Sequence, residues 1–296
     1  MSRYPISLER DIPEVLILDE EKRKIGDEEF YRRKWKKKAL QITVVVLIIL
    51  GIGSYFFFKN LNASRAYKIG VQLIEEEQWE DAIASFDKAL SLKPKYPIAN
   101  LEKGKALLTI GQLYEAEETL RATDPENLSN KKLAADILNL LGIISLREDE
   151  LDEAVKEFEK AIEYQPTASS YLGLAEALVR RETDLDDAIK YVDQAINMRP
   201  DPSMYTRLYS MKGRAYLIKG DHEMANECFL ESLSYNDNFV LSYFYLGVSY
   251  EKTGDIALAK GAFTKAIELN PDYDDAYDAL ERLNNEYPDI NPEAVR

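Results

Sequence analysis

The stretch 240–273 shows the clearest alternation of apolar and polar positions in the chain. Tyr243, Leu246 and Tyr250 follow the i, i+3, i+7 spacing that places side chains on one face of a helix. A second run with helical spacing begins after Gly254. The pattern therefore predicts two amphipathic helices joined by a tight turn.

Small residues lie where these two helices would meet. Gly247 in the first helix and Ala259 in the second allow a close antiparallel approach. Pro271 follows Asn270 and ends the second helix, because proline cannot continue it. The stretch is thus predicted to be one helix–turn–helix unit.

The same pattern recurs along most of the chain. We predict six units, with these bounds: 63–96, 97–123, 135–168, 169–202, 206–239 and 240–273. The polar segment 274–287 repeats only the first half of the pattern, with Tyr277 and Leu280 at apolar positions. An array of repeats needs a terminal helix with a soluble outer face, so we predict a capping helix here and a loose tail over 288–296.

Two units depart from the pattern. The second has Thr123 where alanine is expected, and an Asp-Pro pair follows that cuts its second helix short. Residues 124–134 are then a connection or an extra turn. The fourth unit has Glu176 where glycine is usual, and residues 203–205 form a short insertion before the fifth.

A repeat with glycine at position 8, alanine at positions 20 and 27 and proline at position 32 resembles the tetratricopeptide repeat (TPR) family. In the last unit these positions are Gly247, Ala259, Ala266 and Pro271. The resemblance covers about residues 63–287. It implies an all-α fold, a right-handed TPR superhelix of six repeats plus the capping helix. It also implies a binding role, without naming the partner.

Residues 39–58 form an uncharged apolar run that is long enough to cross ~30 Å of hydrocarbon as a helix. Trp35 before the run and the aromatic stretch 55–58 at its end resemble interfacial anchors. The alternative is a cleaved signal peptide. Bulky aromatics where small residues should precede cleavage, and a long preceding tail, oppose it. We predict a single retained transmembrane helix.

The flanking charges predict an orientation. Six basic residues precede the apolar run closely: Arg32, Arg33, Lys34, Lys36, Lys37 and Lys38. Three follow it: Lys59, Arg65 and Lys68. The excess places the N-terminus in the cytoplasm and the repeats, after a linker at 59–62, on the far side of a cell (inner) membrane.

The segment 1–38 has no sustained helical period. We expect a mostly disordered cytoplasmic tail with a basic juxtamembrane stretch and a short helix over 20–38. The apolar run at 12–18 is either part of a solvated tail or a docking motif for a cytosolic partner, because such runs in disordered tails often bind something.

Composition narrows the classes of function. The formal net charge is -15, which argues against nucleic acid as a partner. Cys228 and His222 are the single cysteine and the single histidine, so a His/Cys metal cluster and a Cys–His catalytic pair are not expected. We predict no enzyme activity, no catalytic residue, no metal and no cofactor.

The resemblance implies that positions 2, 5, 9, 12 and 13 of each first helix line a concave groove. The candidate groove residues are Asn139, Arg147, Arg180, Arg181, Arg207, Arg214, Phe244 and Lys252. Basic residues recur among them although the chain is acidic. They indicate a groove for other proteins or peptides, through acidic segments or C-terminal carboxylates, which arginine binds in a bidentate manner. In the alternative, these arginines pair with neighbouring Asp and Glu.

Chaperone-binding TPR domains resemble one another in a two-carboxylate clamp of Lys and Asn on their first two repeats. Here Lys68 and Gly70 match that motif, but Val71 replaces the asparagine, and Lys105 stands where a second asparagine would be. These departures argue against recognition of chaperone tails.

The sequence favours a membrane-anchored adaptor that binds proteins through its groove. The predicted setting is a bacterial inner membrane with the repeats in the periplasm, in envelope protein assembly, secretion or chaperoning. A second hypothesis is an organellar import receptor whose repeats face the cytosol. In a third, the array docks a separate catalytic chain.

Overall fold

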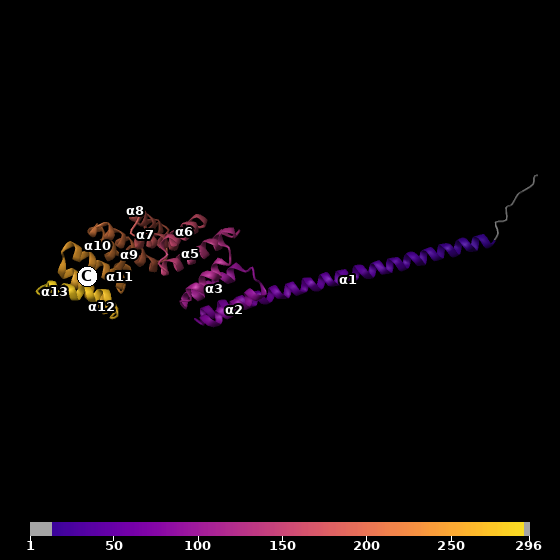
Figure 1. Ribbon diagram of the computed structural model, residues 1–296, viewed down its shortest axis with the longest axis horizontal. Helices are drawn as coiled ribbons and strands as arrows, with labels where there is room; N and C mark the ends of the chain where they lie inside the picture. The colour runs from indigo at the N-terminus through magenta and orange to yellow at the C-terminus, as the bar shows by residue number, and fades with distance from the viewer. Residues whose placement is uncertain (1–13, 293–296) are drawn as a thin grey trace, which may run out of the picture. The chain divides into compact units, whose positions relative to one another are not determined.

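The computed structural model describes residues 14–292, and all the regular secondary structure among them is helical. The chain divides into two compact units, Met1–Ser64 and Arg65–Arg296. The first helix, α1 (Glu14–Glu75), begins in the first unit and ends in the second (Figure 1). The docking segment proposed at 12–18 lies partly outside the described residues.

Helix α1 is longer than expected. It includes residues 20–38, where a short helix was expected, but also residues 14–19, where a disordered tail was expected, and residues 59–62, where a linker was expected. No proline occurs between Pro13 and Pro94, so no backbone donor is lost over this length and the helix runs on without a break. Every side chain over 39–58 is exposed, and by length and composition α1 could cross a membrane, with a mean hydropathy of 2.2 in its most apolar window.

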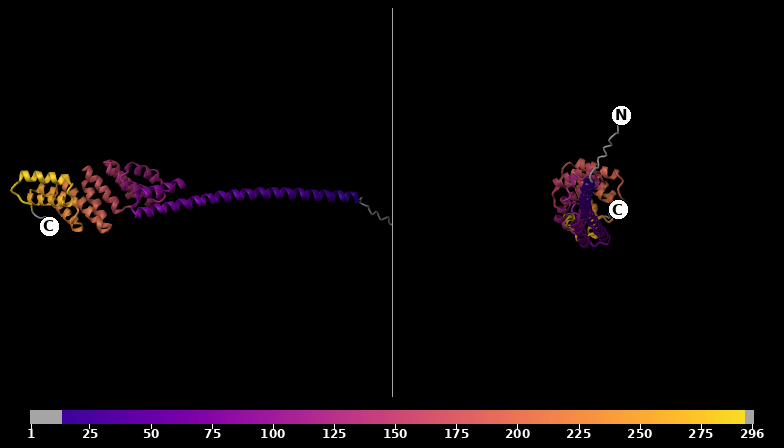
Figure 2. Two further views of the ribbon diagram at one scale, coloured as in Figure 1. Left: turned by 90° about the horizontal axis from the view of Figure 1, so that it is seen from below. Right: turned by 90° about the vertical axis from the view of Figure 1, so that its right-hand side faces the viewer.

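The second unit is a series of antiparallel helix pairs stacked in chain order (Figure 2). The last turns of α1 pair with α2 (Trp79–Leu92). The following pairs are α3 (Pro97–Thr109) with α4 (Leu113–Arg121), α5 (Lys131–Arg147) with α6 (Leu151–Tyr164), and α7 (Ala168–Arg181) with α8 (Leu185–Asn197). After them come α9 (Pro202–Lys219) with α10 (His222–Tyr235), α11 (Val240–Thr253) with α12 (Ile256–Leu269), and the single helix α13 (Asp274–Glu286). The all-α repeat fold expected from the sequence is confirmed.

A glycine in the first helix of a pair packs against a buried side chain of the second, sixteen positions later. A Cβ atom at Gly247 would lie 2.7 Å from the Phe263 ring, and one at Gly213 would lie 2.6 Å from the Phe229 ring. Both rings are fully buried. Only glycine permits this approach, because a tightly packed interior leaves the ring no room to move away. The same contact joins three further pairs: Gly70 with Phe86, Gly104 with Leu120, and Gly142 with Phe158.

The junction between the second and third repeats is built differently. Helix α4 ends at Arg121, Asp124 takes a left-handed conformation (φ 51°), and a 3-10 turn, η1 (Pro125–Asn127), follows. Asn130 then caps α5, its side chain accepting a hydrogen bond from the backbone N–H of Leu133. The connection is therefore shorter than the expected 124–134, and α5 starts before residue 135.

A buried carboxylate lies at this junction. Glu157 of α6 is 2% exposed and receives hydrogen bonds from Arg121 Nη2 (2.8 Å) and Ser145 Oγ (3.0 Å). Burial raises the pKa of Glu157, while the charge of Arg121 and the bond from Ser145 act in the opposite direction. Glu157 thus links α6 to α4 through an ion pair and to α5 through a hydrogen bond.

The extra residues before the fifth repeat form the first turn of a longer helix. Helix α9 begins at Pro202, so the insertion at 203–205 is helical. At the far end of the unit, the fully buried Lys260 of α12 donates hydrogen bonds from Nζ to the backbone oxygens of Tyr287 (2.6 Å) and Ile290 (2.9 Å). This lysine fixes the segment that follows α13.

The glycine–ring contact can be tested by a double-mutant cycle. We expect Gly247→Ala to destabilise the array by about 1–3 kcal/mol, because the added methyl overlaps the Phe263 ring. In a Phe263→Val background the same change should cost much less, since the smaller side chain leaves room. Urea unfolding followed by circular dichroism measures both, and an equal cost in the two backgrounds would show that the contact does not set the helix spacing.

The buried ion pair makes a pH-dependent prediction. Arg121→Ala leaves the Glu157 carboxylate with Ser145 as its remaining partner, so we expect a loss of about 1–3 kcal/mol at pH 7. Because the folded-state pKa of Glu157 is raised, the carboxyl is protonated readily as pH falls, and the loss should shrink at pH 4. Unfolding midpoints at the two pH values measure this. In the matched control, Arg121→Ala in a Glu157→Gln background, the loss should depend on pH much less, and the remaining dependence reports the pair of Arg121 with Glu117 (2.6 Å).

Candidate functional site

The first helices of the pairs form the face that carries the candidate residues. Neighbouring first helices pack directly on one another: α5 on α7, α7 on α9, and α9 on α11. The second helices make no comparable set of contacts among the described residues. The array therefore curves toward its first helices, whose exposed positions line the inner face of the superhelix.

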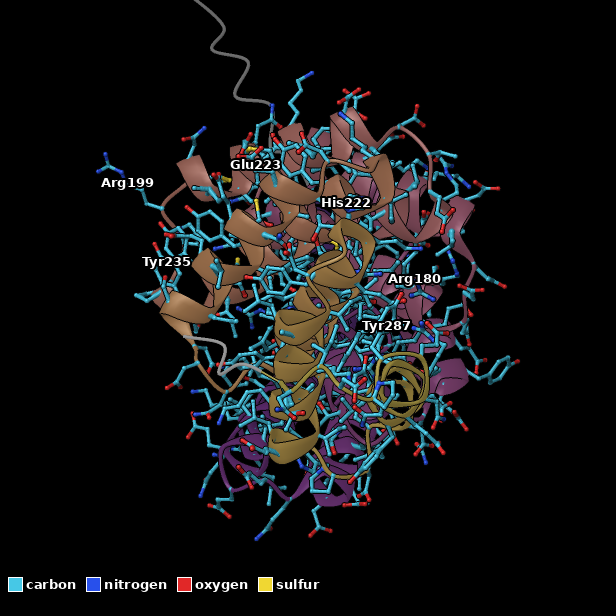
Figure 3. The ribbon with its side chains drawn as sticks, turned by 90° about the vertical axis from the view of Figure 1, so that its left-hand side faces the viewer. Arg180, Arg199, His222, Glu223, Tyr235 and Tyr287 are labelled. Atoms are coloured by element: carbon cyan, nitrogen blue, oxygen red, sulfur yellow. The ribbon has the colours of Figure 1, made fainter. Side chains whose placement is uncertain are left out.

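Two of the candidate arginines bind the ends of neighbouring helices. Arg147 Nη1 donates to the backbone oxygen of Leu108 in α3 (3.1 Å). Arg180 Nη1 donates to the backbone oxygen of Leu146 in α5 (2.5 Å), and its Nη2 binds Asp149 (2.7 Å). The last carbonyls of a helix lack intrahelical partners and carry partial negative charge, so a guanidinium is well suited to them. Figure 3 labels Arg180 among the side chains of this unit.

A third candidate, Arg181, pairs with one acid at the start of α6 and one in the turn that follows α7. Arg181 Nη1 binds Asp152 (2.8 Å), Nη2 binds Asp184 (3.3 Å), and Nε donates to Thr183 (2.6 Å). Pairing with neighbouring acids, the alternative considered from the sequence, thus describes Arg180 and Arg181. These guanidinium groups are already occupied within the repeat array.

Of the remaining candidates, Phe244 and Lys252 lie on α11 in the C-terminal half of the array, whereas Asn139 lies on α5. Phe244 is half-buried, with its ring centroid 5.1 Å from that of Tyr273 and 5.8 Å from that of Phe263, so it packs between helices rather than standing free. Lys252 is exposed in the last turn of α11. Asn139 lies on α5, and its buried Oδ1 has no hydrogen-bond partner among the described residues.

Arg207 and Arg214 are brought together by α9. They line a cavity of about 130 Å³ together with Leu172, Glu176, Ser210, Met211, Phe239 and Leu241. The Arg214 guanidinium lies 5.0 Å from the Tyr245 ring centroid, and Arg207 pairs loosely with Glu176 at 3.8 Å. Burial raises the pKa of the adjacent Tyr273 to about 12, so its hydroxyl stays neutral at physiological pH.

Sequence reasoning missed most of this cavity. Its apolar lining comes from positions that periodicity assigns to the core, and only Glu176, in the place of the usual glycine, marks it. The side chain sixteen positions after Glu176 is the fully buried Val192, where the other repeats have phenylalanine or leucine. The unusual residues at these two positions, Glu176 and Val192, were the sequence signal that could have indicated the cavity.

The described residues show neither a metal-binding group nor a reactive cysteine. They contain no group of three or more His, Cys, Asp and Glu side chains placed to hold a metal ion. The Cys228 thiol is buried, and burial raises its pKa to about 11, which keeps it protonated near neutral pH. The inner face offers positive charge and apolar side chains for binding.

The stacked helix pairs and the continuous inner face define an α-solenoid repeat protein. Four family models described as tetratricopeptide repeat match residues 73–141, 139–205, 206–239 and 240–273. The chain belongs to the tetratricopeptide repeat family, whose arrays are scaffolds for protein–protein interaction and are typically not enzymes.

Several known proteins are similar. Human tetratricopeptide repeat protein 13 is 25% identical over 236 residues, which are 76% of this chain and 22% of that protein. The chain thus spans only 22% of that relative's length.

Solved structures share the fold. The anaphase-promoting complex assembly Cut9–Hcn1 gives a TM-score of 0.66 at 14% identity, over 75% of this chain and 42% of the other. PilF of Pseudomonas aeruginosa gives 0.59 at 15% identity, over 76% and 99%. YrrB, described as a TPR protein with an unusual peptide-binding site, gives 0.50 at 20% identity, over 66% and 97%.

The two helix-capping arginines can be separated from the exposed ones by stability. We expect Arg180→Ala to destabilise the array by about 1–2 kcal/mol, because the Leu146 carbonyl at the end of α5 and the Asp149 carboxylate lose a charged donor. Arg207→Ala should change stability by less than about 0.5 kcal/mol, since its ion pair is long and exposed. Thermal unfolding of both variants measures the difference, and equal effects would contradict the assignment.

Proposed function

We propose that this protein is a membrane-anchored TPR adaptor that binds partner proteins or peptides on the inner face of its superhelix. The observation that carries the proposal is the combination in one chain of a TPR array with an uncharged, fully exposed apolar stretch over 39–58. Apolar side chains exposed along twenty positions of a helix are stable in hydrocarbon rather than in water. One such helix is a sufficient anchor.

The charges beside the stretch support an orientation with the N-terminus in the cytoplasm and the array on the extracytoplasmic side of the cell (inner) membrane. The phenylalanine and tyrosine side chains of 55–58 are all exposed, as interfacial anchors require. An adaptor in this place would serve envelope protein assembly, secretion or chaperoning. An import-receptor role would require the opposite exposure of the array.

The partner surface we propose is the C-terminal half of the inner face. Arg207, Arg214 and Lys252 lie there, and none of the three binds a helix end as Arg147 and Arg180 do. Positive charge on an otherwise acidic protein favours acidic segments or C-terminal carboxylates of other proteins. The peptide-binding site named for YrrB, a protein of the same fold, supports a peptide as the partner class.

Photo-crosslinking tests the binding surface. We expect a photoreactive amino acid at Lys252 to capture a discrete partner in native membranes. One at Lys190, equally exposed but on the second helix α8, should capture much less. Capture should weaken severalfold when Arg207→Glu and Arg214→Glu are combined, because both charges lie on the inner face. Arg147 and Arg180 are unsuitable for this test, since reversing them removes helix caps.

Topology is tested by protease treatment of sealed cells or spheroplasts. The array should be digested only when the extracytoplasmic side is opened. Digestion from the cytoplasmic side would favour the import-receptor alternative. Extraction of the protein by carbonate, without detergent, would contradict the anchor itself.

A further inference from the structure

The cations that precede the apolar stretch 39–58 all lie on helix α1, which continues into that stretch without a break (Figure 1). We call them the basic collar, and its members are Arg32, Arg33, Lys34, Lys36, Lys37 and Lys38. At about 3.6 residues per turn, they spread over roughly two-thirds of the helix circumference, and Trp35 lies in the remaining third. The collar therefore presents positive charge to most sides of the helix.

Most of the basic collar has no acidic partner among the described residues. The one ion pair there joins Arg33 to Glu29 at 4.0 Å, and both side chains are largely exposed, so the pair contributes little. Lys34 lies 6.0 Å from the Phe30 ring centroid, a contact that does not neutralise its charge. All the collar side chains are exposed. Anionic groups from outside the protein can therefore reach them.

The position of the collar along α1 matches the polar layer of a bilayer. From Arg32 to Lys38 the helix rises about 9 Å, and each headgroup layer is roughly 5–8 Å thick. When 39–58 crosses the hydrocarbon, the collar lies at the level of the lipid phosphates. The Cα–Cβ bonds of a helix tilt toward its N-terminus, here away from the hydrocarbon, so the long side chains extend toward the headgroups. Trp35, 72% exposed, is a residue type that favours the same layer.

The acids of this part of α1 lie farther from that layer than the cations. Asp27, Glu28 and Glu29 precede the collar, about 15–18 Å before the first residue of the apolar stretch, whereas the collar lies within about 10 Å of it. Charges separated by more than a Debye length, about 8 Å at physiological ionic strength, are largely screened from each other. A negatively charged surface is thus attracted by the collar and is repelled only weakly by the acids.

We propose that the basic collar binds the phosphate headgroups of anionic phospholipids and enriches these lipids around the anchor. The inference rests on the membrane anchor proposed above and specifies the class of lipid that it recruits. Zwitterionic lipids carry the same phosphate together with a cation that the collar repels, so anionic lipids are preferred. Each basic residue close to a negatively charged surface adds to the attraction.

The arrangement favours lipids over an acidic segment of a soluble protein. A protein segment approaches a helix from one side, where it meets only the cations of that side. Lipids surround a single helix, so cations that point in different directions each have a headgroup beside them. The collar also adjoins the apolar stretch directly, which brings its charges to the membrane surface.

Quenching of tryptophan fluorescence by brominated lipids tests the proposal on the full-length protein. Trp35 and Trp79 are the two tryptophans, and Trp79→Phe leaves Trp35, within the collar, as the single reporter. The protein is reconstituted in phosphatidylcholine vesicles that contain either brominated phosphatidylcholine or brominated phosphatidylglycerol. At low ionic strength we expect phosphatidylglycerol to occupy the sites beside Trp35 at least about threefold more strongly. At about 1 M salt, where the Debye length is about 3 Å, this preference should nearly vanish.

Paired substitutions test whether the preference comes from the collar. Lys36→Gln combined with Lys37→Gln should lower the preference by about half or more, because two charges beside the headgroups are lost. Lys36→Arg combined with Lys37→Arg should retain it, because the charge is kept. The matched control is Arg65→Gln with Lys68→Gln, which removes the same charge from exposed positions of α1 beyond the apolar stretch. It should leave the preference unchanged, since Trp35 is quenched by the lipids next to it.

The outcomes separate this inference from the membrane anchor. A preference that is unchanged at high salt, or an equal loss in the collar variant and in the control, would overturn the lipid site. Equal quenching by the two brominated lipids would also overturn it, but the anchor would stand, because Trp35 would still lie beside lipid. If neither lipid quenches Trp35, α1 does not enter the bilayer, and the anchor fails together with the lipid site.

Discussion

The close contact between a glycine and a buried side chain sixteen positions later governs the geometry of the array. Because each such glycine lacks a Cβ, the two helices of a pair lie at a spacing that other residues do not permit. The pairs that have this contact present a similar surface to their neighbours, and the first helices from α3 to α11 come into direct contact along the array. The inner face, and the placement of any side chain on it, follow from this one steric constraint.

Charged side chains with specific partners lie where the repeats depart from this regular packing. After the short α4, the buried Glu157 pairs with the half-exposed Arg121. In the fourth repeat Glu176 stands where other repeats have glycine, and it pairs with Arg207 on the inner face. The first exchange serves cohesion between repeats, whereas the second places charge beside an apolar cavity. The two departures therefore differ in the burial of their carboxylates: Glu157 is buried, whereas Glu176 is partly exposed.

The repeat architecture could be predicted from the sequence because its signals are local: helical periodicity, turn glycines and helix-ending prolines. The roles of the inner-face arginines could not. Arg180 binds a backbone oxygen 34 residues earlier, one repeat away, and Arg147 reaches 39 residues back across the irregular connection. Spacing predicts the face on which such a side chain lies but does not reveal an acceptor on a neighbouring helix. The cavity was missed for a similar reason, since Glu176 and Val192 acquire meaning only as a pair.

Lys260 has a consequence for the C-terminal end of the array. The last helix pair of a TPR array has no following repeat to cover its apolar side. If that surface is exposed, identical molecules can associate through it. Here Lys260 holds the backbone after α13, and Ile290 packs against the core formed by α10, α11, α12 and α13. The apolar side chains of the last helix pair are thereby covered in part by a segment of the same chain. A single buried lysine thus holds that cover in place.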